Sequence, residues 1–165
     1  MKFISQTIDR FNDLIGQIIS WMALILVLLI GIDVFLRYVF RFSSPAVFEL
    51  EWHLFAALFL LGAGWTFKND QHVRVDLFYQ KFSEKGKAIV NLLGSLLLLL
   101  PFCIVGCFES LDFALNSLNI GETSPDPGGL PARYIIKSCI PISFLLLGLQ
   151  GISVMLKSFL TLTQK

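Results

Sequence analysis

Acidic and basic residues stand where two long apolar stretches of this sequence end, and their types and spacing could do chemistry. Asp33 and Arg37 are four positions apart, as are Glu49 and His53, so in helices each pair would share one face. An ionisable side chain at membrane depth costs roughly 2.5 to 3.5 kcal/mol, which makes it a candidate functional residue. The chemistry open to this set is charge pairing, proton transfer or metal binding.

Charge pairing is the interpretation that we favour. Metal sites in helix bundles use Glu and His three positions apart on facing helices, a spacing that is absent around His53. Proton coupling through Glu49 or Glu51 stays open as an alternative. We expect these two acids to pair with Arg37, with Arg41 or with a partner protein. The sequence thus predicts a charge network at the outer ends of the first two membrane helices, facing a partner, made of Asp33, Arg37, Arg41, Glu49 and Glu51.

Four apolar segments are long enough to hold these charges near a membrane surface. The 165 residues are 55% hydrophobic and 15% charged, with a mean hydropathy of +0.73, and a helix needs about 20 apolar residues to cross a bilayer. The second segment reaches that length only if its helix starts near Pro45. We predict an all-α integral membrane protein with one domain over residues 1–165, spans at about 14–38, 46–67, 88–110 and 138–157, and an outer loop at 119–137.

The distribution of basic residues predicts the orientation of these spans. Nine of the thirteen Lys and Arg residues lie in the N-terminal segment, the 68–87 connection and the C-terminal tail, which share one side of a four-span chain. Cytoplasmic flanks of membrane helices are enriched in Lys and Arg. We therefore expect both termini to be cytoplasmic.

The residues ahead of the first span follow a helical pattern. Apolar residues recur there at helical spacing with polar residues between them, at Ile4, Ile8, Phe11, Ile15 and Ile18. This pattern predicts an amphipathic helix that lies on the cytoplasmic surface before the chain turns into the membrane. The alternative is that the same residues extend the first span. The 68–87 connection could add a short interfacial helix.

Prolines and leucines shape the prediction for the last two spans. Pro101 is expected to kink the third helix, and Leu111, Leu115 and Leu118 to extend it beyond the membrane. Pro141 is expected in the first turn of the fourth helix, where its missing N–H costs nothing. Mildly polar residues inside spans, such as Asn91, Ser95 and Gln150, are expected to join helices, and Cys103, Cys107 and Cys139 to be small buried hydrophobes.

A loop on the predicted outer side and two tryptophans complete the candidate residues. Three Pro and three Gly between residues 121 and 131 exclude a helix there. Glu122, Asp126 and Arg133 give this loop charges that an interface could pair, although it could also be a plain connector. Trp52 and Trp65 are predicted to be anchors at the membrane interfaces.

Several classes of function are excluded. The net charge of +1 leaves no basic excess for a nucleic acid, and the chain has no phosphate-binding Gly loop, nucleophile elbow or zinc motif. We therefore expect no enzyme, no cofactor and no bound metal.

Several segments together resemble the small membrane subunit of tripartite ATP-independent periplasmic (TRAP) transporters, the DctQ type. The resemblance covers about residues 15 to 157 and is most specific from Ser124 to Lys137. Many members of the family have two adjacent acids at this place, whereas in this chain one residue separates Glu49 from Glu51. The other matching segments are Asp33 to Tyr38, Gly62 to Trp65, His72 to Asp76, Ile140 to Pro141 and Leu149 to Gly151.

The resemblance implies a subunit that does not bind substrate itself. It implies two partners in the bacterial inner membrane system: a large, elevator-type permease subunit of the DctM type, which carries the sodium and substrate sites, and a periplasmic binding protein of the DctP type, which delivers an organic acid. The small subunit would be a scaffold, and its outer loop would help dock the binding protein.

Two other classes stay open from the residues alone. A self-contained, proton-coupled exporter of four helices would need a Glu facing a central cavity at the membrane midplane, and Glu49 and Glu51 lie near the outer boundary. A membrane anchor of a redox complex would need haem or quinone ligands, for which one intramembrane His is too few.

Overall fold

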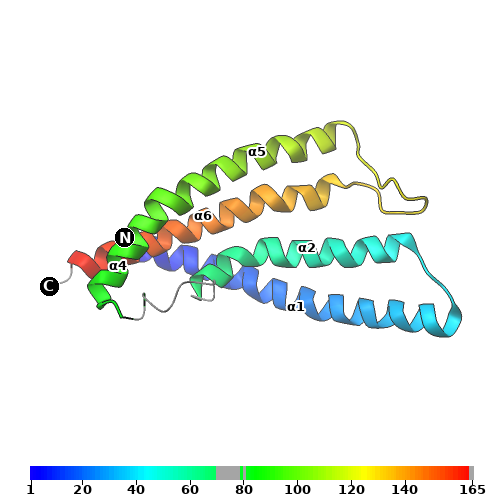
Figure 1. Cartoon of the computed structure of the whole chain (residues 1–165), viewed down its shortest axis with the longest axis horizontal. Helices are drawn as coiled ribbons and strands as arrows, with labels where there is room; N and C mark the ends of the chain where they lie inside the picture. Colours follow the sequence, from blue (N-terminus) through cyan, green and yellow to red (C-terminus); the bar gives the residue numbers. More distant parts are fainter. Residues whose placement is uncertain (70–78, 80, 164–165) are drawn as a thin grey trace.

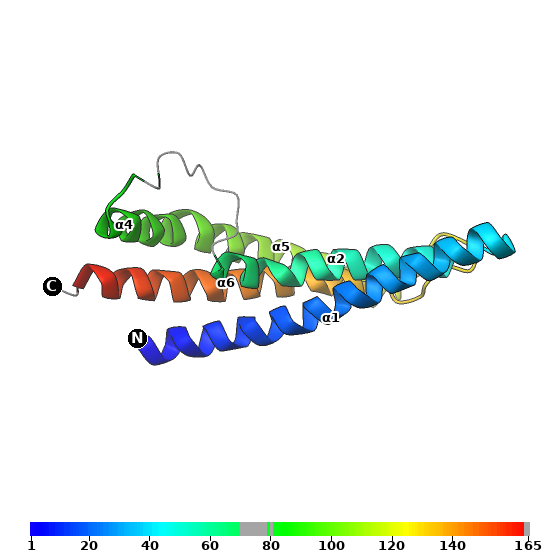
Figure 2. The same cartoon turned by 90° about the horizontal axis from the view of Figure 1, so that it is seen from below.

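A computed structural model of the chain describes residues 1–69, 79 and 81–163, and four long helices run side by side in them (Figures 1 and 2). Helix α1 spans Lys2–Phe40, α2 spans Pro45–Lys68 and α6 spans Tyr134–Thr163. The remaining helix joins α4 (Glu84–Gly94), a π-helical segment (Ser95–Leu99) and α5 (Leu100–Asn119). Each of the four is long and apolar enough to cross a membrane, so the chain is a multi-pass membrane protein.

The helices form a slab more than a closed bundle. Figure 1 shows α5, α6, α2 and α1 in that order across the molecule, and α6 packs against α1, α2, α4 and α5. Both chain termini lie at one end, which we call the terminal end. The opposite end, with the connections 41–44 and 120–133, is the loop end. Helix α6 is therefore the element that holds the others together.

Helix α1 is continuous and does not turn where the sequence predicts a separate surface helix. Five of its six buried residues follow a seven-residue period from end to end: Ser5, Asn12, Ile19, Leu26 and Asp33. In the N-terminal part the polar residues of this stripe face the bundle, while Phe3 and Ile4 are exposed. The prediction of a separate surface helix was therefore wrong, because α1 continues from Lys2 to Phe40 and packs the polar residues Ser5 and Asn12 into the protein, while Lys2, Gln6 and Arg10 are exposed.

The two prolines lie at different places in their helices, and the kink expected at Pro101 stays a prediction. The π-helical segment lies directly before Pro101, where Leu100 donates its backbone N–H to Ser95 O, and such segments accommodate the ring of a proline. Pro141 lies inside α6 and not in its first turn, because α6 begins at Tyr134. The extension of the third helix beyond Leu111 is confirmed, since α5 ends at Asn119.

The connections differ from their expected bounds. Helix α2 begins at Pro45, and the loop between α5 and α6 covers residues 120–133, shorter than the expected 119–137. The expected interfacial helix in the 68–87 connection and the His72 to Asp76 segment fall mainly or wholly on residues 70–78, outside the described residues.

Candidate functional site

Glu49 is the centre of a buried ion-pair network at the loop end. It lies in the second turn of α2, and its side chain is 3% exposed. Its carboxylate accepts hydrogen bonds from three residues of the 120–133 loop. Arg133 Nη2 donates to Oε1 at 2.9 Å, the backbone N–H of Leu130 donates to Oε2 at 2.6 Å, and the hydroxyl of Ser124 donates to Oε1. One carboxylate of α2 therefore fixes a loop that follows it by more than 70 residues in the chain.

The loop is folded on itself as well as on Glu49. Ser124 N donates to Leu130 O at 3.1 Å, and Arg133 N donates to Glu122 O at 2.9 Å. Three residues of the loop have a positive φ, which are Gly121 at 59°, Gly128 at 80° and Ala132 at 62°, so the backbone turns sharply at these points. These contacts hold the loop in one shape, with the side chain of Asp126 exposed at its tip.

A second ion pair closes the base of the loop. The amine of Lys137, in the first turn of α6, bonds the carboxylate of Glu122. This hydrogen bond and the nearby positive charges of Lys137 and Arg133 hold the pKa of Glu122 below its ordinary value. Glu122 is therefore ionised throughout the neutral pH range and stays paired there.

The five charges predicted to form one network are divided by the structure. Arg37 pairs with Asp33 on α1, and Glu51 of α2 lies within electrostatic range of both side chains. Glu49 pairs with Arg133, a residue that the sequence placed in the separate loop set, and not with Arg37 or Arg41. Among the described residues Arg41 has no ion pair, and it ends α1 in the left-handed conformation with φ at 52°.

The two predicted anchor tryptophans have different surroundings. Trp52 is 37% exposed, stacks on His53 with ring centroids 3.8 Å apart, and has the guanidinium of Arg133 at 5.7 Å from its ring centroid. Trp65 lies over α1, where a Cβ on Gly16 would come within 2.5 Å of the indole ring. Trp65 therefore contributes to helix packing, and Trp52 covers the Glu49 network.

A polar network lies at the terminal end, and it confirms the prediction that Gln150 joins helices. Asn12 Nδ2 donates to Gln150 Oε1 at 2.9 Å, Gln150 Nε2 donates to Asp9 Oδ1 at 3.1 Å, and Ser153 Oγ donates to the same oxygen at 2.8 Å. Asn12, Gln150 and Ser153 are completely buried. Lys157 completes the network through an ion pair of 2.5 Å with Asp9 Oδ2. These residues join α1 to α6.

Gln150 was singled out from the sequence only as one of several polar residues inside spans. Asp9 and Asn12 were not among the candidate residues of the sequence analysis. The signal that could have found them is the seven-residue spacing of Ser5 and Asn12 with the apolar residues Ile19 and Leu26, which puts all four on one face of a long helix.

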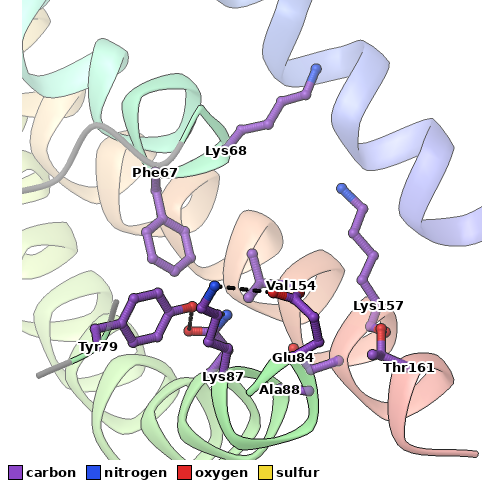
Figure 3. Close-up of a pocket in the computed structure, with 11 residues that line it drawn as sticks. Phe67, Lys68, Tyr79, Glu84, Lys87, Ala88, Val154, Lys157 and Thr161 are labelled. Atoms are coloured by element: carbon purple, nitrogen blue, oxygen red, sulfur yellow. Dashed lines mark hydrogen bonds and ion pairs between the residues drawn. The ribbon is translucent and has the colours of Figure 1, made fainter. Parts of the chain in front are cut away.

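A cavity of about 400 Å³ opens beside this network, between α2, α4 and α6 (Figure 3). Three lysines contribute to its walls, and in Figure 3 the amines of Lys68 and Lys157 point towards α1, away from Lys87. Each lysine pairs with an acid, in the pairs Lys68–Asp13, Lys87–Glu84 and Lys157–Asp9. The lysines of the cavity therefore carry no excess positive charge for an anionic ligand.

The described residues form a membrane protein whose ion pairs are concentrated at the two ends of the slab. Within the described ranges, no three His, Cys, Asp or Glu side chains are grouped so that they could hold a metal ion. The charges that are buried serve to join helix to loop and helix to helix.

Comparisons with known proteins agree with this class. Residues 26–161 match the family described as "Tripartite ATP-independent periplasmic transporters, DctQ component". A protein of Haemophilus influenzae named "Putative TRAP transporter small permease protein" is 30% identical over 147 residues, which are 89% of this chain and 89% of that protein. No solved structure shows a significant match.

The chain belongs to the DctQ family of TRAP transporter small permease subunits. Members of this family are transporter subunits and not enzymes, and they imply a large permease and a binding protein as partners. The self-contained exporter and the redox anchor that the sequence left open are therefore set aside.

Proposed function

We propose that this chain is the fixed scaffold of a sodium-coupled TRAP importer in the bacterial inner membrane, with both termini in the cytoplasm. In this proposal the large permease subunit binds sodium and an organic acid and moves, and the binding protein delivers the acid from the periplasm. The small subunit holds its shape throughout, and its loop end faces the periplasm.

The observation that carries the proposal is the presence of buried polar networks at both ends of one slab. Glu49 ties the 120–133 loop to α2, and the Asn12, Gln150 and Asp9 bonds tie α1 to α6. Between them Ser143 Oγ donates to Leu60 O at 2.7 Å and joins α6 to α2. Because breaking a buried ion pair costs about 3 to 5 kcal/mol, these helices are held in one arrangement. A static frame of this kind suits the part of a transporter against which another part moves.

The loop end supports the docking part of the proposal. Glu122 and Arg133 are used inside the loop, in ion pairs with Lys137 and Glu49. Asp126 is exposed, and its backbone N–H and carbonyl are both bonded within the loop. A charge held at the tip of a preformed loop can meet a charged partner at a low entropic cost. Asp126 is therefore the residue through which we expect this loop to meet the binding protein.

Uptake by reconstituted proteins tests the shared function. Liposomes that hold this chain together with its large permease, supplied with the binding protein and its acid, should take up that acid when a sodium gradient is imposed. Liposomes that hold this chain alone should show none. Sodium-dependent uptake by this chain alone would contradict the scaffold proposal.

The docking role is tested separately by Asp126→Lys, with Thr123→Lys as a control at another exposed loop position. Asp126→Lys should lower uptake when the binding protein is limiting and should be rescued by an excess of it, because rim charges act mainly on the association rate. Assembly with the large permease should not change. Equal dependence on binding protein in the two variants would make the loop a connector only.

A further inference from the structure

The groove between α1 and α2 near the loop end is the surface with an unbalanced charge. It has a volume of about 220 Å³ and is lined by Leu26, Ile30, Phe48, Glu51, Trp52 and Phe55. The aromatic residues continue along α2, since Phe48, Phe55 and Phe59 are 61%, 60% and 72% exposed. An apolar, aromatic face with a carboxylate in it is unusual at membrane depth, because a charged group there is costly unless it is paired.

Glu51 differs from its neighbour Glu49 in having no donor for one of its oxygens. Its Oε1 is buried, and no group in the described part of the chain donates to it. The nearby charges are Asp33, which is buried, and Arg37, which already pairs with Asp33. Arg37 is therefore taken by Asp33, and the carboxylate form of Glu51 leaves this corner of the groove with one uncompensated negative charge.

We propose that this groove is the docking surface for a transmembrane helix of the large permease subunit, and that this helix places a basic side chain against Glu51. The inference rests on the proposed function, because it takes the large permease as the partner. A basic side chain would balance the excess charge and donate to the buried Oε1. The exposed rings of Phe48 and Phe55, which precede and follow Glu51 on α2, would pack on the helix that carries this basic side chain.

The groove on the other side of the slab lacks these features. It lies between α5 and α6, has a volume of about 360 Å³, and its lining contains no Asp, Glu, Lys or Arg. Lipid acyl chains can cover this apolar groove. They do not suit the α1–α2 groove, because an acyl chain has no hydrogen-bond donor for the carboxylate of Glu51. The contrast between the two grooves assigns the partner to the α1–α2 side and makes the α5 face a matched control.

Photo-crosslinking in the intact complex tests the location. Benzoylphenylalanine is placed at Phe55 in the groove, at Phe59 beyond it, or at Phe108 on α5, which are 60%, 72% and 69% exposed. We expect covalent adducts with the large permease from positions 55 and 59 and none from position 108. Adducts from position 108 alone, in a complex that still assembles, would overturn this inference and leave the proposed function standing. Failure of the wild-type chain to copurify with its permease would instead contradict the proposed function.

The charge is tested by Glu51→Gln, which keeps the shape of the side chain and removes its charge, with Glu109→Gln on the exposed part of α5 as the control. If a basic side chain pairs with Glu51, the variant should reduce the copurified permease by roughly fivefold or more, while the amount of variant chain in the membrane is unchanged. Copurification equal to that of Glu109→Gln would mean that Glu51 is protonated and faces lipid, which overturns the inference. A basic residue of the permease that crosslinks near position 55 should, when changed to Glu, restore assembly with Glu51→Lys.

Discussion

The two ends of the slab are both closed by buried polar groups, but the groups are of different kinds. At the loop end a single carboxylate, Glu49, receives donors from three residues of the loop region. At the terminal end the carboxylate of Asp9 also has three partners, which are Gln150, Ser153 and Lys157, and a neutral bond between Asn12 and Gln150 is added to them. The two carboxylates differ in burial, because the side chain of Glu49 is 3% exposed and that of Asp9 is 15% exposed. The loop end therefore depends more strongly on one buried charge than the terminal end does.

Removal of that one charge should have the largest effect on stability. Glu49→Ala leaves the guanidinium of Arg133 and the N–H of Leu130 without their acceptor, and should destabilise the chain by about 3 to 5 kcal/mol. Thermal unfolding in detergent and limited proteolysis should show a lower midpoint and new cleavage within residues 120–133. Glu109→Ala, at an exposed acid on α5, is the control. Equal protease resistance of the two variants would disprove the central role of Glu49.

Glycines at the two ends allow a direct comparison of packing. A Cβ on Gly129 would lie 2.8 Å from Glu49 Oε2 at the loop end, and one on Gly64 would lie 2.5 Å from Asn12 Oδ1 at the terminal end. Gly129→Ala and Gly64→Ala should each cost about 1 to 3 kcal/mol of folding stability, which unfolding curves measure. Gly31→Ala is the control, because nothing lies within 4 Å of its added Cβ. Unfolding curves of all three variants that superimpose on that of the wild type would contradict the close packing at both networks.

The neutral network should show a smaller and shared effect. In a double-mutant cycle of Asn12→Ala and Gln150→Ala, the coupling energy should be about 0.6 to 1.7 kcal/mol, as for other hydrogen bonds between membrane helices. The bond tested joins Asn12 Nδ2 to Gln150 Oε1 at 2.9 Å. Strictly additive effects of the two changes on unfolding would show that the bond contributes nothing to the joining of α1 to α6.

The smallest effect should be a dependence of loop stability on acid. The pKa of Glu122 is lowered in the folded chain by its bond to Lys137, so folding releases a proton from this group in mildly acidic solution. The ion pair of Glu122 therefore contributes fully to stability above the pKa that Glu122 has in the unfolded chain. This contribution is lost as the pH falls through the lowered pKa of Glu122 in the folded chain. Hydrogen exchange of residues 120–133 between pH 7 and pH 3 measures this loss. Lys137→Gln should reduce the difference in hydrogen exchange between pH 7 and pH 3. A pH profile equal to that of the wild type would contradict the role of the Glu122–Lys137 pair.

Apolar length was sufficient to predict the four helices from the sequence, since a run of about 20 apolar residues has few other solutions in a chain of this composition. The direction in which the polar residues of α1 face could not be predicted in the same way. An amphipathic pattern identifies two faces but not which of them meets protein, and in a membrane the apolar face can be the outer one. The pattern therefore does not predict that Asn12 is completely buried against α6.

The charged residues show a similar limit. Glu49 and Arg133 were each identified as candidates from their types and positions, but they are 84 residues apart, and local spacing contains no information on such a pair. Asp33 and Arg37 were predictable because four residues of helix bring them together. The pairing of Glu49 with the loop depends on how α2 and α6 pack, which single-residue patterns do not encode.

The central claim, that this chain is a fixed frame, is tested most directly by distances measured within it during transport. Spin labels at position 39 on α1 and position 118 on α5, both exposed and near the loop end, report the width of the slab in a variant without native cysteines. Pulsed electron resonance on the complete transporter should give one distance distribution that does not change when sodium, substrate and binding protein are added. A shift of that distribution on addition of sodium and loaded binding protein would show that the slab itself moves, and would contradict the account.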